Sequence, residues 1–199
     1  LFGKSRQSIE AGPYLEALKA RSLEVLLLTE PVDEYVMQSV REYKEKKIIS
    51  ADSDELKLEK LDQEPEGKAL NKKDTKSLCK WLKESLKDKV SEVETGDRLI
   101  DSPVCIVGGD GLGGASARRV MKMMQGGDDA MPSSPVKLQV NQRHPIIKGL
   151  SKLVDSDKDT AELIANQLLD NALATANLLD DPREMIARSY KAIEKLANQ

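Results

Sequence analysis

The segment from Lys158 to Asn198 constrains the fold more than any other part of the chain, because it carries two helical patterns joined by residues 177–182. Between Ala161 and Ala176, apolar residues recur at steps of three and four with further leucines beside them, so the apolar face is wide. The second helix repeats the pattern from Ile186 to Ala197. Two helices with faces this wide cannot cover one another. The pair therefore needs either the rest of the chain or a second copy of itself.

The start of the second helix is marked by its residue types. Asp181 is suited to be the N-cap, Pro182 fits the first helical position, and Glu184 stands three residues past the cap. We expect an antiparallel helix pair with a sharp connection.

Composition limits the classes of protein to which the chain can belong. Its 199 residues suffice for one large or two small domains, and the 3% aromatic content predicts aliphatic cores. A net charge of −3 argues against a general nucleic-acid binder. No apolar run approaches the roughly 20 residues of a membrane span. Cys79 and Cys105 have no CxxC spacing, which favours buried free thiols and a reducing compartment.

The first part of the chain has the pattern of a small α/β unit. Ser5–Arg21 is predicted to be helical with a break at Gly12–Pro13, and Glu24–Thr29 to be a strand buried on both sides. A helix opening at Glu30 and a strand at Lys47–Ser50 follow, and we expect parallel pairing. This unit occupies residues 1–52. The acidic residues 53–68 are predicted to be a solvated linker.

Residues 69–199 are predicted to form a mixed α/β domain. A helix spans about Leu70 to Lys87, with Asn71 as its cap and a stripe of leucines. The remaining expected elements are strands at Val90–Ile100, Pro103–Val107 and Val136–Val140 and a helix from His144 to Val154. His144 is the only histidine, so a loop or capping role is favoured over a metal site or histidine-based catalysis.

The segment Gly109–Gly114 matches G-x-G-x-x-G, follows an apolar strand and precedes a helix at Ala115–Gln125. The match is incomplete, because residues 126–135 have loop composition where a dinucleotide-binding turn requires a second strand ending in an acidic residue. No Lys-Ser or Lys-Thr follows the glycines, which excludes a P-loop. A dinucleotide-binding α/β enzyme domain remains the alternative function.

The helix at Ala115–Gln125 admits two interpretations. It is either an amphipathic helix packed on the core or, because it is rich in methionine and flanked by glycines, a surface that accepts apolar partners of variable shape.

Five separated blocks carry a resemblance to a known family: Glu24–Tyr35, Arg41–Tyr43, Arg98–Pro103, Arg143–Ile147 and Asp180–Pro182. In sequence, order and spacing they resemble the heat shock protein 90 chaperones. The resemblance implies that residues 1–52 are the end of a middle domain and residues 69–199 a carboxyl-terminal dimerisation domain. The implied fold class is α+β, ending in a helix pair that forms a four-helix bundle with its copy.

The resemblance also implies a function and its sites. The parent would be an ATP-dependent homodimeric chaperone whose ATP and Mg²⁺ bind upstream, so this chain is expected to have no catalytic residue, metal or cofactor. The implied dimer interface consists of Leu168, Leu169, Ala172, Leu173, Ala176, Ile186, Tyr190, Ile193 and Leu196. The implied client contacts are Leu112, Val120, Met121, Met123 and Met124.

The expected partners are a second copy and unfolded or partly folded clients, with no nucleic acid and no membrane. No Met-Glu-Glu-Val-Asp tail follows Gln199, so a helical-repeat cochaperone is not expected. The last residues resemble mitochondrial and bacterial members, and the mitochondrial matrix is favoured over a bacterial cytoplasm.

Overall fold

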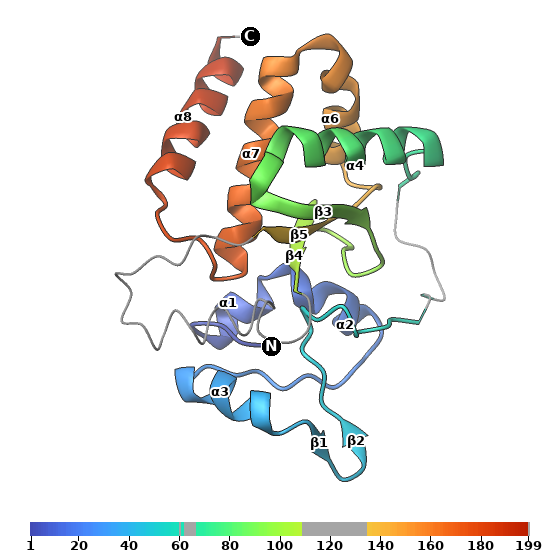
Figure 1. The fold of residues 1–199 in the computed structure, drawn as a ribbon, viewed down its shortest axis with the longest axis vertical. Helices are drawn as coiled ribbons and strands as arrows, with labels where there is room; N and C mark the ends of the chain where they lie inside the picture. Colours follow the sequence, from blue (N-terminus) through green and yellow to red (C-terminus); the bar gives the residue numbers. More distant parts are fainter. Residues whose placement is uncertain (60, 62–66, 109–134, 199) are drawn as a thin grey trace.

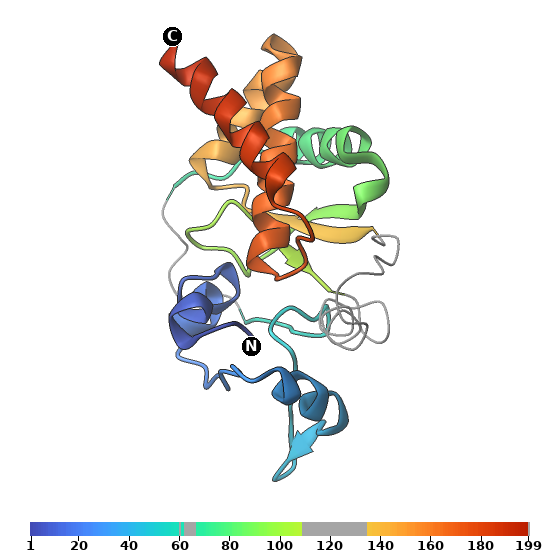
Figure 2. The same ribbon diagram turned by 90° about the vertical axis from the view of Figure 1, so that its left-hand side faces the viewer.

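The computed structural model describes residues 1–59, 61, 67–108 and 135–198, which form an α+β fold. Helices α4, α6, α7 and α8 lie on one side of a small sheet, and residues 1–58 lie on the other (Figures 1 and 2). The described helices are α1 (Arg6–Glu10), η1 (Pro13–Leu15), α2 (Glu16–Ala20), α3 (Pro31–Ser39), α4 (Lys72–Leu86), η2 (Lys87–Lys89), α6 (Pro145–Ser156), α7 (Lys158–Thr175) and α8 (Arg183–Ala197). The described strands are β1 (Glu42–Tyr43), β2 (Lys46–Lys47), β3 (Val90–Thr95), β4 (Val104–Val107) and β5 (Val136–Val140).

The larger sheet has the strand order β3-β5-β4. Strand β5 pairs in parallel with β3 and antiparallel with β4, where Cys105 lies opposite Gln139. The predicted strands at 103–107 and 136–140 are confirmed, but β3 ends at Thr95 instead of Ile100. The next residue, Gly96, approaches the neighbouring strand so closely that a Cβ atom there would lie 2.1 Å from Nε2 of Gln139.

The main core fills the space between this sheet and helices α4, α6 and α7. Strand β4 alternates, so Val104 and Ile106 face the helices while Cys105 and Val107 face the other side. The predicted leucine stripe of α4 (Leu78, Leu82 and Leu86) is buried in this core, and Asn71 caps the helix by accepting a hydrogen bond from the backbone N–H of Asp74 at 2.9 Å.

The predicted parallel α/β unit at the start of the chain is wrong. Residues 24–29 are not a strand: Leu28 forms an isolated bridge, with backbone hydrogen bonds to Leu1 and Gly3, and the carbonyl of Leu26 accepts from the amino group of Leu1 at 2.9 Å. The side chain of Leu26 is exposed. Strands β1 and β2 form an antiparallel hairpin. Lys44 and Glu45 connect them with φ of 47° and 62°, the left-handed pair that a two-residue hairpin turn requires. Helix α3 is present, and Tyr35 on it is exposed.

The acidic segment is exposed over most of its described residues, but it begins inside the protein. Asp52 and Ser53 are buried, and the backbone N–H of Gly108 donates to the carbonyl of Asp52 at 2.7 Å. The N–H of Asp54 in turn donates to the carbonyl of Gly108 at 3.0 Å. The residues that follow the first unit are therefore hydrogen-bonded beside the end of β4 before the chain becomes exposed.

Candidate functional site

Helix α7 begins at an aspartate cap. Asp157 accepts a hydrogen bond from the backbone N–H of Thr160 at 3.1 Å and another from its hydroxyl, and these bonds lower the pKa of the carboxyl group. The buried side of the helix consists largely of small residues, which lets α7 lie close to the sheet. Its members are Ala161, Ala165, Leu168, Leu169, Ala172 and Ala176.

Part of the expected interface therefore belongs to the core of this chain. Leu168, Leu169, Ala172 and Ala176 are buried beneath α7, and Leu173 is half-buried beside them. The remaining residues of the expected interface lie on α8, and their side chains are exposed.

Helix α8 begins one residue later than its sequence predicts. Pro182 occupies the cap position, which Asp181 was expected to hold, because Asp181 lies one residue too far from the helix and accepts instead from the backbone N–H of Arg183 at 2.9 Å. Asp181 also pairs with the Arg183 guanidinium, and this bonding lowers the pKa of its carboxyl group. The predicted capping box is absent from α8.

Every residue of α8 is at least partly exposed, although the helix is strongly amphipathic. The side toward α7 carries the half-buried residues Met185, Arg188, Ser189 and Ala192. Beside it lie Ile186, Tyr190, Ile193 and Leu196, which are 43%, 68%, 56% and 70% exposed. Their spacing of four, three and three residues places them along one side of the helix. We call these residues the α8 stripe.

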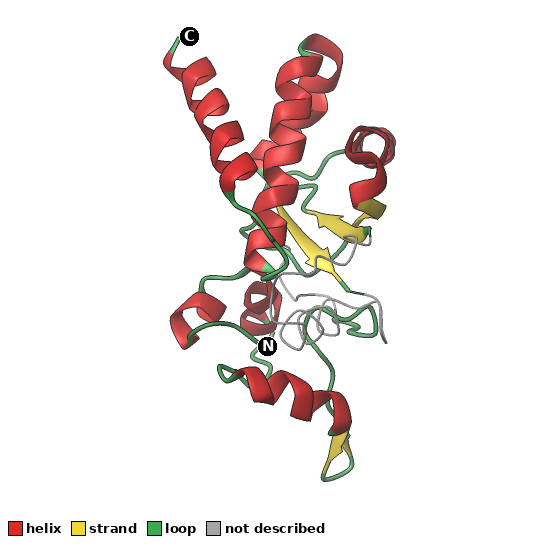
Figure 3. Ribbon diagram, turned by 60° about the vertical axis from the view of Figure 1, so that its left-hand side comes forward, coloured by secondary structure: helices red, strands yellow, loops and turns green. Residues whose placement is uncertain are grey.

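Helix α8 is attached to α7 mainly through polar contacts. The Arg188 guanidinium pairs with the buried carboxylate of Asp170, and the Lys195 ammonium donates to the Thr160 hydroxyl at 2.7 Å. The two helices diverge toward the end of α8 (Figure 3). Sequence reasoning missed the ion pair, although an aspartate on the apolar face of α7 was a signal that it needed a partner.

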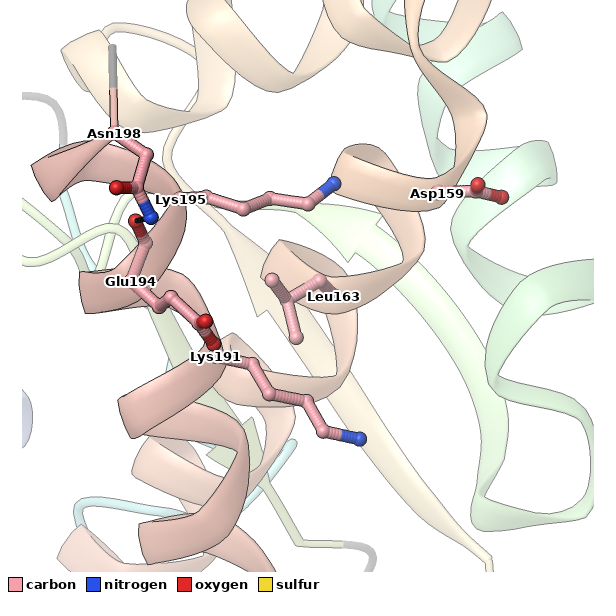
Figure 4. Close-up of a pocket in the computed structure, with 6 residues that line it drawn as sticks. All are labelled: Asp159, Leu163, Lys191, Glu194, Lys195 and Asn198. Atoms are coloured by element: carbon pink, nitrogen blue, oxygen red, sulfur yellow. Dashed lines mark hydrogen bonds between the residues drawn. The ribbon is translucent and has the colours of Figure 1, made fainter.

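An open groove of about 590 Å³ lies between the diverging helices. Leu163 points into it from α7, and long charged side chains surround it (Figure 4). Its lining residues are Asp159, Leu163, Lys191, Glu194, Lys195 and Asn198. Most of these lining residues are exposed, and the α8 stripe is the stronger candidate site.

The structure also locates the single histidine and the two cysteines. His144 caps α6 as expected, with Nδ1 accepting from the backbone N–H of Ile146 at 3.1 Å. Cys105 is a buried free thiol whose pKa burial raises to about 12, and Cys79 is a half-buried free thiol. Within the described ranges no cluster of metal-ligating side chains is found, and no helix there is long and apolar enough to cross a membrane.

The Gly109–Gly114 turn, the helix expected at 115–125 and the expected client contacts all lie outside the described residues. The client contacts concerned are Leu112, Val120, Met121, Met123 and Met124.

The matches to known proteins extend over nearly the whole chain. A family model described as Hsp90 protein matches residues 1–199. Chaperone protein HtpG of Desulfotalea psychrophila is 36% identical over 202 residues, covering 99% of this chain and 32% of that protein. Heat shock protein 75 kDa, mitochondrial, of Bos taurus is 35% identical over 204 residues, covering 98% of this chain and 28% of that protein. Heat shock protein 83 of Leishmania donovani is 32% identical over 200 residues, with 98% of this chain and 44% of that protein covered. The chain thus spans about a third of the length of the HtpG relatives that it matches.

Proposed function

The chain belongs to the Hsp90 protein family, and from this premise we propose that it is the homodimerisation and client-contacting module of an ATP-dependent chaperone. The ATP-dependent step, with its ATP and Mg²⁺, is assigned to a part of the parent outside this chain. Because the family match includes the Gly109–Gly114 segment, we do not propose the alternative function of a dinucleotide-binding enzyme domain.

The observation that carries the dimerisation proposal is the α8 stripe. Large apolar side chains at 43% to 70% exposure line a helix that contributes no buried residue to the core of its own chain. Burial of an Ile or Leu side chain stabilises a complex by about 1.5–3 kcal/mol. A two-fold interface uses each residue twice, so the stripe can offset the roughly 4–15 kcal/mol that association costs.

In the proposed dimer, the α7–α8 pair and its copy form a four-helix bundle. Ile186, Tyr190, Ile193 and Leu196 contact the second copy, with Leu173 at the edge. Leu168, Leu169, Ala172 and Ala176 support the interface from below by fixing α7 on the sheet. This division differs from the sequence-based expectation, in which all of these residues met the copy.

Light scattering coupled to size-exclusion chromatography tests the dimer. The unmodified chain is expected to be dimeric at micromolar concentration, and Ile193→Glu is expected to be a folded monomer because it places a charge in the centre of the stripe. Glu184→Lys is the control, since position 184 is exposed and lies about 120–180° around the helix from the residues of the α8 stripe. It should leave the dimer intact. A dimer that withstands Ile193→Glu, or a monomeric unmodified chain, would reject the proposal.

Client contact is proposed for residues 115–125, where the sequence predicts a helix, on the apolar positions named above. The support is the family resemblance together with the methionine-rich composition, because methionine adapts to apolar partners of undefined shape. The clients are unfolded or partly folded proteins.

The compartment is a further proposal. The relatives include bacterial and mitochondrial proteins of nearly equal identity, so they favour neither. We retain the mitochondrial matrix, with a bacterial cytoplasm as the alternative.

A further inference from the structure

The carboxylate of Glu16, in the first turn of α2, is held by a turn of the chain that lies far away in sequence. Its Oε2 atom accepts hydrogen bonds from three successive backbone N–H groups, those of Ile100 at 2.8 Å, Asp101 at 2.9 Å and Ser102 at 3.1 Å. Its Oε1 atom accepts from the Ser102 hydroxyl. Hydrogen bonds to an ionised acceptor are roughly twice as strong as neutral ones, and successive N–H groups in a turn form a concave seat for an anion.

This seat is built by a buried side chain and does not depend on Glu16 alone. Asn141 is 5% exposed, and its Nδ2 atom donates to the carbonyls of Ile100 at 3.0 Å and Ser102 at 3.2 Å. Its backbone N–H donates to the carbonyl of Pro103 at 2.8 Å. With the carbonyls of the turn held by Asn141, the N–H groups remain directed toward Glu16.

Further polar contacts join the same two parts of the chain, including the backbone hydrogen bonds of Gly108 with Asp52 and Asp54 described above. The Tyr14 hydroxyl donates to the carbonyl of Ile106 in β4 at 2.8 Å. The buried guanidinium of Arg98 donates to the carbonyls of Ala51 at 2.7 Å and Leu56 at 3.2 Å, and also to that of Ser53. We call Tyr14, Glu16, Arg98 and the 100–102 turn the joint.

The joint differs in kind from the core beside it. The main core comprises aliphatic side chains of α4, α6, α7 and the sheet, whereas the joint is composed mainly of directional hydrogen bonds with Tyr14 as its principal apolar contact. Hydrogen bonds are lost within a small displacement, so such a contact can separate without opening the core.

The joint is also connected to the helix pair. Ile106, whose carbonyl holds Tyr14, extends its side chain into the same core as Leu169 of α7, and α7 carries α8. Packed elements therefore lie between the joint and α8 without a break.

We propose that Glu16 is a releasable latch: seated in the 100–102 turn, its carboxylate fixes the orientation of residues 1–58 relative to the sheet, and its removal lets the two parts reorient while each stays folded. The latch is independent of the proposed dimerisation, which light scattering measures separately.

The test compares Glu16→Ala and Glu16→Gln with the control Glu10→Gln. Glu10 pairs only locally, with Arg6 at 2.8 Å, and lies outside the joint. Nitroxide labels at Glu45→Cys and Lys152→Cys, both exposed positions on opposite sides of the joint, report orientation in a Cys79→Ser background. Mixing the labelled protein with an excess of unlabelled protein removes the contribution of label-to-label distances between two copies of a dimer. Amide hydrogen exchange is measured in parallel.

Glu16→Ala is expected to broaden the distance distribution and to speed exchange at Ile100, Asp101 and Ser102 at least about tenfold, with the amides of Leu168 and Leu169 still protected. Glu16→Gln keeps an acceptor oxygen and should preserve the narrow distribution with intermediate exchange. Glu10→Gln should match the unmodified chain. An unchanged distribution in Glu16→Ala would overturn the latch, as would loss of protection at Leu168 and Leu169, because release would then not be separable from unfolding.

Discussion

At the scale of the residue, one imidazole holds the start of a helix. His144 caps α6 through an unprotonated Nδ1 atom that accepts from the N–H of Ile146. Burial lowers the pKa of this imidazole, against the opposing influence of Glu16 and of the carbonyl and charge of Asp101, while Lys148 lowers it further. Protonation of Nδ1 would replace the acceptor with a donor and remove the cap.

Stability is therefore expected to depend on this residue at mildly acidic pH. Since the folded pKa lies below the usual histidine value of 6.5, the unfolded chain binds the proton more readily. The contribution is complete above that value and is lost as pH falls through the folded pKa. Between pH 7 and pH 5 the unmodified chain should lose more unfolding free energy than His144→Asn, because asparagine caps without titrating there.

Urea unfolding at a series of pH values measures this difference. Parallel stability profiles for the unmodified chain and His144→Asn would show that the cap does not titrate.

At the scale of the element, one of the polar contacts that attach α8 to α7 is a partly buried ion pair between Arg188 and Asp170. Arg188→Met should leave the buried Asp170 carboxylate without a partner and cost about 3–5 kcal/mol. The double variant Asp170→Asn with Arg188→Met should recover most of this loss, because no uncompensated charge remains.

Thermal or urea unfolding of the single and double variants forms the test. The control Arg183→Met breaks the exposed pair with Asp181 and should leave stability unchanged within error. If Arg188→Met were as mild as this control, the pair would contribute no attachment for α8.

Local patterns predicted most elements of the second part of the chain. Asn71 and His144 were identifiable as caps and the leucine stripe of α4 as a core face, because periodicity and capping depend on neighbours within one turn. The strand predicted at residues 24–29 was wrong because an apolar run does not show whether a neighbouring strand is available to pair with it. Among the described residues, its backbone hydrogen-bonds with the short segment at Leu1 and Gly3.

The candidate site was predicted in part. The width of the apolar faces indicated that α7 and α8 must pack against a further surface. It did not indicate whether that surface belongs to the same chain or to a second copy. Leu169 is covered by the sheet of its own chain, whereas Tyr190 is not covered in this structure. Contacts such as Glu16 with Ser102 join residues 86 apart in sequence, and no local pattern encodes them.

At the scale of the whole molecule, dimerisation predicts that unfolding depends on protein concentration. If the folded state is a dimer, each tenfold increase in concentration stabilises it by about 1.4 kcal/mol relative to unfolded chains. The thermal midpoint of the unmodified chain should rise across a hundredfold concentration series, and that of Ile193→Glu should stay constant. Differential scanning calorimetry measures both, and a midpoint independent of concentration in the unmodified chain would contradict the dimer.

The strand order β3-β5-β4 has a consequence for how this protein is made. Strand β5 is the last of the three in sequence but lies between the other two, so β3 and β4 have no hydrogen-bonded neighbour in this sheet until residues 136–140 have been synthesised. Helices α6 and α7, which cover the sheet, are translated later still. On the ribosome, residues 90–107 therefore cannot complete this sheet until residues 136–140 have been synthesised, and the helical cover from α6 and α7 follows later still.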